Sequence, residues 1–249
     1  MNEKLSVVII TKNEEKNIKR CLESVKWADE IIVVDSGSHD STLEIAKSYG
    51  AKTYIQNWLG FGPQKNFAVS KATHEWILAI DADEVISSEL NIAILDAIKS
   101  NRNTCFQFKR LSQFCGKWIK HGDWRNDIIL RLFKKDCARY SNDLVHEKVI
   151  TKVKPETIKG LMLHYSQDYI NVSLKKMNDY SDATSLTLFN KGRKTNLFKA
   201  SLHKKWTFIR GFIIKRGFLD GSHGYLIAKL TAYGSYFKYI KLWERNNRK

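Results

Sequence analysis

The sequence predicts an α/β fold in which a mostly parallel central sheet carries helices on both faces. Two observations favour this class. Short β-branched runs alternate with amphipathic segments over the first 85 residues, a pattern typical of repeated strand and helix units. The 249 residues are 43% hydrophobic, which is sufficient for one large domain or for one domain with an appendage.

The first elements follow from the spacing of apolar residues. The run KLSVVIIT predicts a strand over residues 4–11, and Asn13 is placed to cap the helix that follows. The apolar residues of that helix recur at helical spacing, at Ile18, Cys21, Leu22 and Val25. The run EIIVVD predicts a second strand over 30–35, with a Gly/Ser loop and a helix over 42–49 after it. The run AKTYIQ predicts a third strand over 51–56.

Later segments predict two further regions. Gly62 and then Pro63, at a plausible first helical position, begin a helix that leads into the strand EWILAID. From about Cys105 the pattern changes to shorter strand-like pieces, CFQFKRL, IILRLFKK and HEKVITKV. After His164 it changes again to long helical periodicity. We therefore expect one domain over 1–165 and a C-terminal helical region over 166–249.

Polar groups follow three of the predicted strands, at 11–14, 35–40 and 81–84. Each loop alone is equally well explained as an ordinary polar connection. Ligands, however, collect at the carboxyl ends of parallel strands, and three such ends can converge on one edge. The acids Asp81, Asp83 and Glu84 repel one another, so their clustering predicts a cation, or a phosphate carried on a cation, that offsets the repulsion.

Several other classes of site lack support in the sequence. The loop DSGSHDST has neither the GxGxxG spacing of dinucleotide binding nor a GxxxxGK[ST] phosphate loop. The four cysteines show no CxxC or Cys/His ligand spacing, and the N-terminus lacks the layout of a signal peptide. We interpret the thiols as reduced and the compartment as cytoplasmic. The longest apolar runs are interrupted by charges, so no membrane span is predicted.

The net charge of +16 is concentrated near the C-terminus. Residues 191–249 contain fifteen lysines and arginines against two acids, a net +13, and eleven aromatic residues lie between Phe198 and Trp243. Such a segment attracts nucleic acid, anionic lipid headgroups or other polyanions. Its cationic and aromatic residues suit two helices, broken around LDGSHG, that lie in the headgroup plane. Alternatively, the aromatics form a second small core.

Five blocks of the sequence, in order, resemble the signature blocks of family 2 glycosyltransferases with the GT-A fold. They are SVVIITKNEEKNIKRCLESV, IIVVDSGSHDST, FGPQKNFA, WILAIDADE and WRNDIILRLF with VHEKV. The C-terminal block RGFLDGSHGYLIAKLTAYGSYFKYIKL further resembles the bacterial lipopolysaccharide-core β-1,4-glucosyltransferase group. The resemblance covers nearly the whole chain, and it is more specific for the superfamily than for one sugar or acceptor.

The resemblance implies an inverting, metal-dependent hexosyltransferase with a UDP-sugar donor, for which UDP-glucose is expected. The implied acceptor is a lipid-linked oligosaccharide, the inner core of lipopolysaccharide, reached from the cytoplasmic face of an anionic membrane. A capsule or another lipid-linked glycan is the alternative acceptor. A nucleic-acid-binding protein that uses the basic tail is the alternative from another class, but no nucleic acid is expected because no recognised nucleic-acid motif is present. An inactive relative that binds a nucleotide-sugar is the third hypothesis.

The same resemblance implies roles for individual residues of the donor site. Thr11 and Glu14 would lie against the nucleoside, and Asp35 would bind the base or ribose. Lys65 would approach the diphosphate. Two further acids form the DXD element: Asp81 would face the ribose and metal region, and Asp83 would be a direct ligand of Mg²⁺ or Mn²⁺. Hard oxygen ligands of this kind suit either ion.

The family base lies at an acidic position before an RLF-like strand, which Asp127 matches. Asp123 is a nearby competitor. His146 and Glu147, in the VHE block, are candidates for a metal ligand, an acceptor contact or the base itself. Arg131 is expected to pair with acids or phosphate in the site. Each position also has a plain structural interpretation, such as a turn residue for Asp127 or a hydrogen-bonded structural histidine for His146.

Overall fold

The computed structural model describes residues 3–100, 102–125, 127–141, 147–167 and 169–248. The chain divides into two compact units. The first unit contains the residues up to Arg110 and those from 126 to Tyr165. The second unit contains Leu111–Arg125 and the residues from Ser166 onward. The two units meet between Tyr165 and Ser166 and group Leu111–Arg125 with the second unit. The expected domains, 1–165 and 166–249, stay a prediction.

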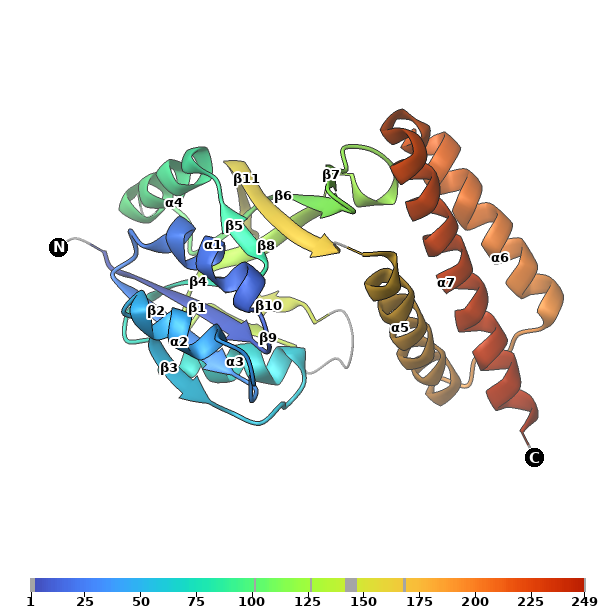
Figure 1. Ribbon diagram of the computed structural model, residues 1–249, viewed down its shortest axis with the longest axis horizontal. Helices are drawn as coiled ribbons and strands as arrows, with labels where there is room; N and C mark the ends of the chain where they lie inside the picture. The colour runs from blue at the N-terminus through green and yellow to red at the C-terminus, as the bar shows by residue number, and fades with distance from the viewer. Residues whose placement is uncertain (1–2, 101, 126, 142–146, 168, 249) are drawn as a thin grey trace. The chain divides into compact units, whose positions relative to one another are not determined.

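Nine described strands form one sheet with the order β3-β2-β1-β4-β8-β6-β11-β5, and β7 pairs with the end of β6 (Figure 1). The strands β3, β2, β1 and β4 are parallel, whereas β8, β6 and β5 join through antiparallel pairs. The bounds are Leu5–Thr11 (β1), Glu30–Asp35 (β2), Lys52–Ile55 (β3), Trp76–Asp81 (β4), Glu84–Ile86 (β5), Cys105–Phe114 (β6), Lys117–Trp118 (β7), Asp127–Lys134 (β8) and Glu156–Gln167 (β11). Ala138–Tyr140 (β9) and Val149–Thr151 (β10) form a separate antiparallel pair.

Helices cover both faces of the parallel strands, as the sequence predicts. Their bounds are Glu15–Val25 (α1), Thr42–Ser48 (α2), Phe61–Lys71 (α3) and Ser88–Ser100 (α4). Alternate residues of β1 point to opposite faces, so that Ile9 packs with Leu22 of α1, whereas Val8 packs with Ala68 of α3. Both faces of the strand are buried, which explains its nearly continuous apolar sequence.

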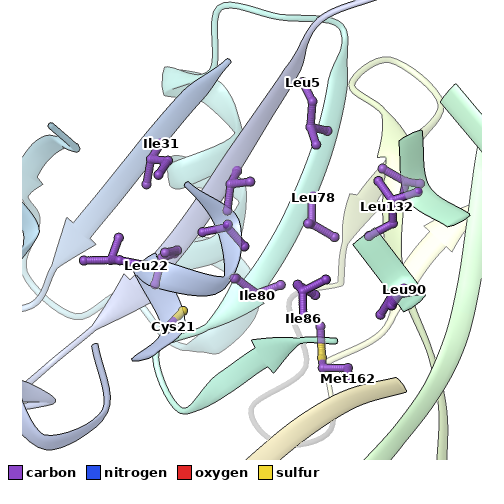
Figure 2. Packing of buried hydrophobic residues seen from close by; sticks show 14 of the residues in the cluster. Leu5, Cys21, Leu22, Ile31, Leu78, Ile80, Ile86, Leu90, Leu132 and Met162 are labelled. Atoms are coloured by element: carbon purple, nitrogen blue, oxygen red, sulfur yellow. The ribbon is translucent and has the colours of Figure 1, made fainter. Parts of the chain in front are cut away.

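The larger core lies on the face covered by α1 and α4. Figure 2 shows Leu5 and Leu78 from neighbouring strands, with Leu22 of α1, Leu90 of α4 and Met162 of β11 around the same interior. Each of these side chains is buried. The core thus joins the parallel strands to the antiparallel part of the sheet and holds the carboxyl ends of the parallel strands in place.

Several local expectations differ from the structure. Asn13 does not cap α1; it has a φ of 53° and its side chain accepts a hydrogen bond from the backbone of His39. Pro63 is the third residue of α3 rather than the first. The helix α4 and the strand β11 were not predicted, although Leu90 and Ile94 of α4 have helical spacing.

Glu30 is a buried carboxylate at the amino end of β2. Ser6 Oγ and the backbone N–H of Thr73 donate to its Oε2 at 2.5 and 2.9 Å, and Lys52 Nζ lies 2.7 Å from its Oε1. Burial alone would raise the pKa of Glu30, but these hydrogen bonds, led by Lys52, outweigh it and lower the pKa from 4.5 to about 2.

A depressed carboxyl pKa stabilises the fold above the unfolded-state value, and this stabilisation is lost as the pH falls toward the folded-state value. We expect Glu30→Gln to lower the melting temperature at pH 7, with a loss on the order of 2 kcal/mol. The gap between wild type and variant should shrink by more than half between pH 5 and pH 3, as followed by thermal denaturation. A gap that stays constant over this range would contradict the assignment.

The second unit is a helical bundle (Figure 1). Its helices are Ile170–Asn190 (α5), Leu197–Ile209 (α6) and Gly221–Asn247 (α7), and α7 packs against both others. A π-helical turn, Arg210–Ile214, extends α6. Gly224 of α7 permits a close approach, because a Cβ there would lie 1.9 Å from the carbonyl oxygen of Gly217. Within the described helices, none has the length and apolar content required to cross a membrane.

Asp220 explains why Leu111–Arg125 belongs to this unit. It is 4% exposed, and its Oδ2 accepts hydrogen bonds from the backbone N–H groups of Lys120 and His121 at 3.1 and 2.7 Å. The Lys117 ammonium donates to its backbone carbonyl at 2.8 Å. Phe114 and Ile119 complete the junction by packing with Ile227 of α7.

Candidate active site

Three parallel strands end at one edge of the sheet. Thr11 at the end of β1 lies opposite Asp35 at the end of β2, and Ile10 lies opposite Asp81 at the end of β4. The carboxyl ends of these strands therefore bring three predicted site residues to one edge, where ligands of α/β sheets bind.

The loops after β1 and β2 are tied together. The backbone N–H of Asn13 donates to Ser38 Oγ at 2.7 Å, and the N–H of Glu14 donates to Thr42 Oγ1 at 2.8 Å. Glu14 Oε2 also accepts a hydrogen bond from the Asn17 side chain at 2.7 Å. These contacts hold the beginning of α1 beside the Gly/Ser loop.

Asp35 is fully buried and shapes its own loop. Its Oδ1 accepts hydrogen bonds from the backbone N–H groups of Gly37 and Ser38, both at 2.8 Å, and Ser38 Oγ donates to its Oδ2 at 2.5 Å. Thr11 is 5% exposed, and its Oγ1 has no hydrogen-bond partner among the described residues. A buried hydroxyl without a partner is costly unless a ligand or water satisfies it.

Seven charged side chains of the first unit form a chain of alternating sign, which we name the ionic chain. Its contacts range from 2.7 to 3.2 Å. In order, its members are Glu147, Lys65, Asp81, Arg131, Glu84, Arg110 and Asp127. The structure thus brings five predicted site residues together with two that were not predicted.

Lys65 is buried near the beginning of α3. Its Nζ lies 3.0 Å from Asp81 Oδ1 and 2.9 Å from Glu147 Oε1, and the side chain is 4% exposed. Burial and the charge of Arg131 oppose protonation, but attraction to Asp81, Tyr140 and Glu147 outweighs them and raises the pKa of Lys65. Lys65 is therefore a buried ammonium at the sheet edge, a point charge suited to phosphate oxygens.

Gly62 makes the position of Lys65 possible. A Cβ at Gly62 would lie 1.8 Å from the carbonyl oxygen of Ser141. Only glycine therefore permits this approach between the first turn of α3 and the end of β9. Glu147 is also close to this turn of α3, because its Cβ would lie 3.6 Å from a Cβ placed at Gly62.

Asp81 lies between two cations. Arg131 Nη2 donates to its Oδ2 at 2.7 Å, while Lys65 contacts its Oδ1. Burial would raise the pKa of Asp81, but the charges of Arg131 and then Lys65 hold it well below the ordinary range. The side chain keeps 28% of its surface exposed, so it remains within reach of a ligand.

Glu84 is the buried centre of the ionic chain. It is fully buried, and its Oε1 lies 2.9 Å from Arg110 and 3.2 Å from Arg131. Its Oε2 accepts a hydrogen bond from the backbone N–H of Asp81 at 2.9 Å. Arg110 also contacts Asp127, with Nη2 and Nε 2.7 and 2.8 Å from Asp127 Oδ2. Arg110 thereby orients a carboxylate whose side chain is 35% exposed.

These contacts change the explanation of the acidic cluster. The clustering of the acids predicts a bound cation as the offsetting charge, but for Asp81 and Glu84 lysine and arginine side chains supply that charge. Asp83 differs, because its Oδ2 lies 3.3 Å from His164 Nε2 on β11. The backbone carbonyl of Asp83 also accepts a hydrogen bond from Tyr165 N–H at 2.9 Å.

Two ligand-type side chains, Asp83 and His164, therefore face each other at the sheet edge. Within the described ranges, no three His, Cys, Asp or Glu residues converge as a metal site. His146, which the sequence analysis proposed as a ligand, lies outside the described residues. The Asp83 carboxylate fits an ion that takes its remaining ligands from water and substrate phosphates, as Mg²⁺ usually does.

Asp123, the competing candidate for the base, lies in the second unit and is held by two cations there. Arg210 Nη2 and Lys215 Nζ lie 3.0 and 2.9 Å from its carboxylate oxygens. Burial opposes ionisation, but the hydrogen bonds of these two residues lower the pKa of Asp123. Trp124 beside it packs edge-on against Phe114, at 5.8 Å between ring centroids.

Sequence reasoning did not assign three residues of this region: Glu84, Arg110 and His164. Glu84 was visible within the acidic cluster, but its arginine partners were not. Arg110 stands in the strand-like piece CFQFKRL, and a cation within an apolar strand is a signal for a buried acid partner. His164 ends the apolar alternation of β11, which was not recognised as a strand.

Comparison with known proteins connects this geometry to a family. The model of the family Glycosyl transferase family 2 matches residues 6–151. A glycosyltransferase of Rickettsia typhi is 34% identical over 254 residues, which cover 97% of this chain and 87% of the relative. The lipopolysaccharide core biosynthesis glycosyltransferase LpsC of Rhizobium meliloti is 25% identical over 250 residues, covering 97% and 93%.

Among solved structures, glucosyl-3-phosphoglycerate synthase of Mycobacterium tuberculosis, in complex with Mn²⁺, UDP and glucosyl-3-phosphoglycerate, is 22% identical. The match covers 45% of this chain and 44% of that one, with a TM-score of 0.38. The family model spans most of the first unit, including the strands that form the site edge, and the Rickettsia relative extends through both units. The chain therefore belongs to glycosyl transferase family 2 and is a glycosyltransferase.

Proposed function

We propose that this glycosyltransferase is an inverting, metal-dependent hexosyltransferase that transfers glucose from UDP-glucose to the inner core of lipopolysaccharide. The observation that carries the proposal is the contrast within the acidic cluster. Asp81 is neutralised by protein cations, whereas Asp83, two residues later, faces a histidine. A carboxylate together with substrate phosphates is a usual set of ligands for a divalent cation that binds a diphosphate.

In this proposal Asp83 and His164 would hold Mg²⁺ or Mn²⁺ beside the donor diphosphate. When bound, the ion supplies Lewis-acid stabilisation of the charge on the departing diphosphate. Lys65 contributes a second positive charge, because a phosphate oxygen can replace Glu147 as its partner. Arg131 keeps Asp81 ionised and in place beside the ribose.

The nucleoside lies against the ends of β1 and β2. The buried Thr11 hydroxyl gains a hydrogen-bond partner there, Glu14 contacts the nucleoside, and Asp35 reaches the base or ribose through the loop that it organises. This arrangement follows the general rule that α/β sheets bind nucleotides at the carboxyl ends of their strands.

Asp127 serves as the general base. Its partly exposed carboxylate takes the proton of the acceptor hydroxyl while that oxygen forms a bond to the anomeric carbon and the bond to the diphosphate breaks. A single in-line displacement of this kind inverts the configuration. Arg110 holds Asp127 by two contacts and is itself held by the buried Glu84, so the base has a fixed orientation.

The acceptor is a lipid-linked oligosaccharide, and the enzyme works at the inner face of the cytoplasmic membrane. Two observations support this part. The LpsC relative is named for lipopolysaccharide core biosynthesis and matches 97% of this chain. The C-terminal segment carries a large positive charge, which attracts both anionic lipid and a phosphorylated glycolipid. Transfer assays with lipopolysaccharide core and with capsule-type lipid-linked glycans distinguish the two acceptor classes.

A thermal-shift screen tests the donor site. Purified protein is heated with UDP, UDP-glucose, UDP-galactose, UDP-GlcNAc, GDP-mannose or a CMP-sugar, each with and without Mn²⁺. We expect a rise in melting temperature confined to the uridine series and dependent on Mn²⁺, because a ligand that binds only the native state stabilises it. An equal rise with GDP-mannose, or a rise independent of metal, would contradict the donor or the metal assignment, respectively. No shift with any nucleotide would contradict both.

A further inference from the structure

Several large apolar side chains of α6 and of the turn that extends it are exposed to solvent instead of being buried in the helical bundle. Seven large apolar side chains of residues 197–214 are exposed. Five of them, exposed by 42 to 72%, recur at helical spacing, and we name these five the α6 stripe: Phe198, Leu202, Trp206, Ile209 and Ile213. The small residues Ala200, Thr207 and Gly211 are instead the buried ones on α6 and the turn that extends it. Phe208 and Phe212 contact Tyr225 of α7, with ring centroids 5.9 and 5.7 Å apart. This segment therefore packs through these two rings and its small side chains, while the α6 stripe is exposed.

The stripe is continuous along the helix. Its members are separated by four, four, three and four residues, so those on α6 itself lie within an arc of about 80° at 100° per residue. The exposed lysines Lys199 and Lys205 lie at its two margins, about 20° beyond the arc on either side. An apolar stripe between two rows of cations results.

The charge around the stripe has one sign. Residues 191–219 include nine lysines and arginines and no aspartate or glutamate. Arg210 and Lys215 are partly engaged by Asp123, while Lys199 and Lys205 are exposed. A partner of the stripe must therefore be apolar at its centre and negatively charged at its margins.

We propose that the α6 stripe is the membrane-contact surface of this enzyme and that its partner is an anionic lipid bilayer. Phenylalanine, leucine, tryptophan and isoleucine enter the boundary between headgroups and acyl chains, while the flanking lysines meet lipid phosphates. A second copy of the chain fits less well, because two like-charged margins would repel each other. A nucleic acid would contact the lysines and the two aromatic rings but would leave Leu202, Ile209 and Ile213 exposed.

This inference deepens the proposed location of the enzyme and rests on it. The test is flotation of purified full-length protein with vesicles of phosphatidylcholine, with or without phosphatidylglycerol. We expect wild type to float with the anionic vesicles. The triple variant Phe198→Ser, Leu202→Ser, Trp206→Ser should bind them at least tenfold more weakly, because each exposed apolar side chain contributes through the area it buries.

Two further variants separate the apolar and the charge contributions. Lys199→Gln with Lys205→Gln should weaken binding to anionic vesicles by about twenty-five-fold, since each cation near the surface contributes roughly fivefold. The matched control is Ile92→Ser with Leu95→Ser on α4, where two side chains are exposed by 63 and 37% and acids stand nearby at Glu89 and Asp96. The control should bind vesicles as wild type does.

Distinct results would overturn the inference. One such result is that the triple variant binds vesicles as strongly as wild type. Another is that wild type is a dimer and the triple variant a monomer, while neither protein binds vesicles. Oligonucleotide binding that needs the stripe, without vesicle binding, would also overturn it. The uridine-nucleotide thermal shift is measured on the same variants. If wild type binds vesicles but shows no thermal shift with uridine nucleotides, only the proposed donor chemistry is contradicted. If wild type shows the thermal shift but does not bind vesicles, only the proposed membrane-contact surface is contradicted.

Discussion

Replacing Asp83 with asparagine is expected to lower the transfer rate at saturating Mn²⁺ by about a thousandfold or more. The amide has no charge with which to hold a divalent cation, and loss of about 4 kcal/mol of stabilisation of the departing diphosphate corresponds to that factor. The Asp83 side chain is partly exposed and its Oδ2 lies 3.3 Å from His164 Nε2, so the fold should tolerate the change. Turnover of UDP-glucose and the Mn²⁺-dependent thermal shift should both be lost.

The matched control for this prediction is Asp96→Asn, which removes one exposed acid from α4 and leaves the site unchanged. It should retain wild-type turnover. His164→Asn should raise the Mn²⁺ concentration needed for half-maximal turnover, because it removes the second ligand-type side chain. Wild-type turnover by the Asp83 variant at limiting Mn²⁺ would show that another group holds the metal.

Replacing Asp127 with asparagine is expected to reduce kcat by about a hundredfold to ten-thousandfold, the usual contribution of a general base. Asparagine keeps the hydrogen-bonding shape beside Arg110 but accepts no proton from the acceptor. The uridine-nucleotide thermal shift should persist, since Asp127 takes no part in donor binding. This combination of lost turnover and retained donor binding separates a base from a donor-binding residue.

Two other acids give the comparison that makes the assignment falsifiable. Asp123→Asn should keep turnover within about threefold but lower stability by about 1 kcal/mol, because Arg210 and Lys215 lose their charged partner. Glu147→Gln should retain turnover and alter donor affinity through Lys65. The assignment of Asp127 would be contradicted if Asp127→Asn kept a kcat near that of wild type while one of these two variants lost kcat by a hundredfold or more. The residue changed in that variant would then be the general base.

The parallel half of the sheet could be predicted because its sequence signals are local. The apolar run of β1 and the spacing of Ile18, Cys21 and Leu22 in α1 each fix an element without reference to the rest of the chain. The antiparallel half was harder. The strand β11 begins after Pro155 and alternates weakly, and its identity as a strand comes from pairing with β5, more than seventy residues earlier. Such pairing leaves little trace in a short window.

The sequence by itself determined the order of strands and helices at the site edge, the acids that end β4 and the positive charge of the C-terminal segment. Only the tertiary structure decided which charges meet. Lys65 and Glu147 are 82 residues apart and lie 2.9 Å apart, and Glu84 meets Arg110 from another strand. Ion pairing depends on distance in space and on burial, which a linear sequence does not contain. For that reason the sequence indicated a cation among the acids, and the fold decided that Asp81 and Glu84 have protein cations while Asp83 faces His164.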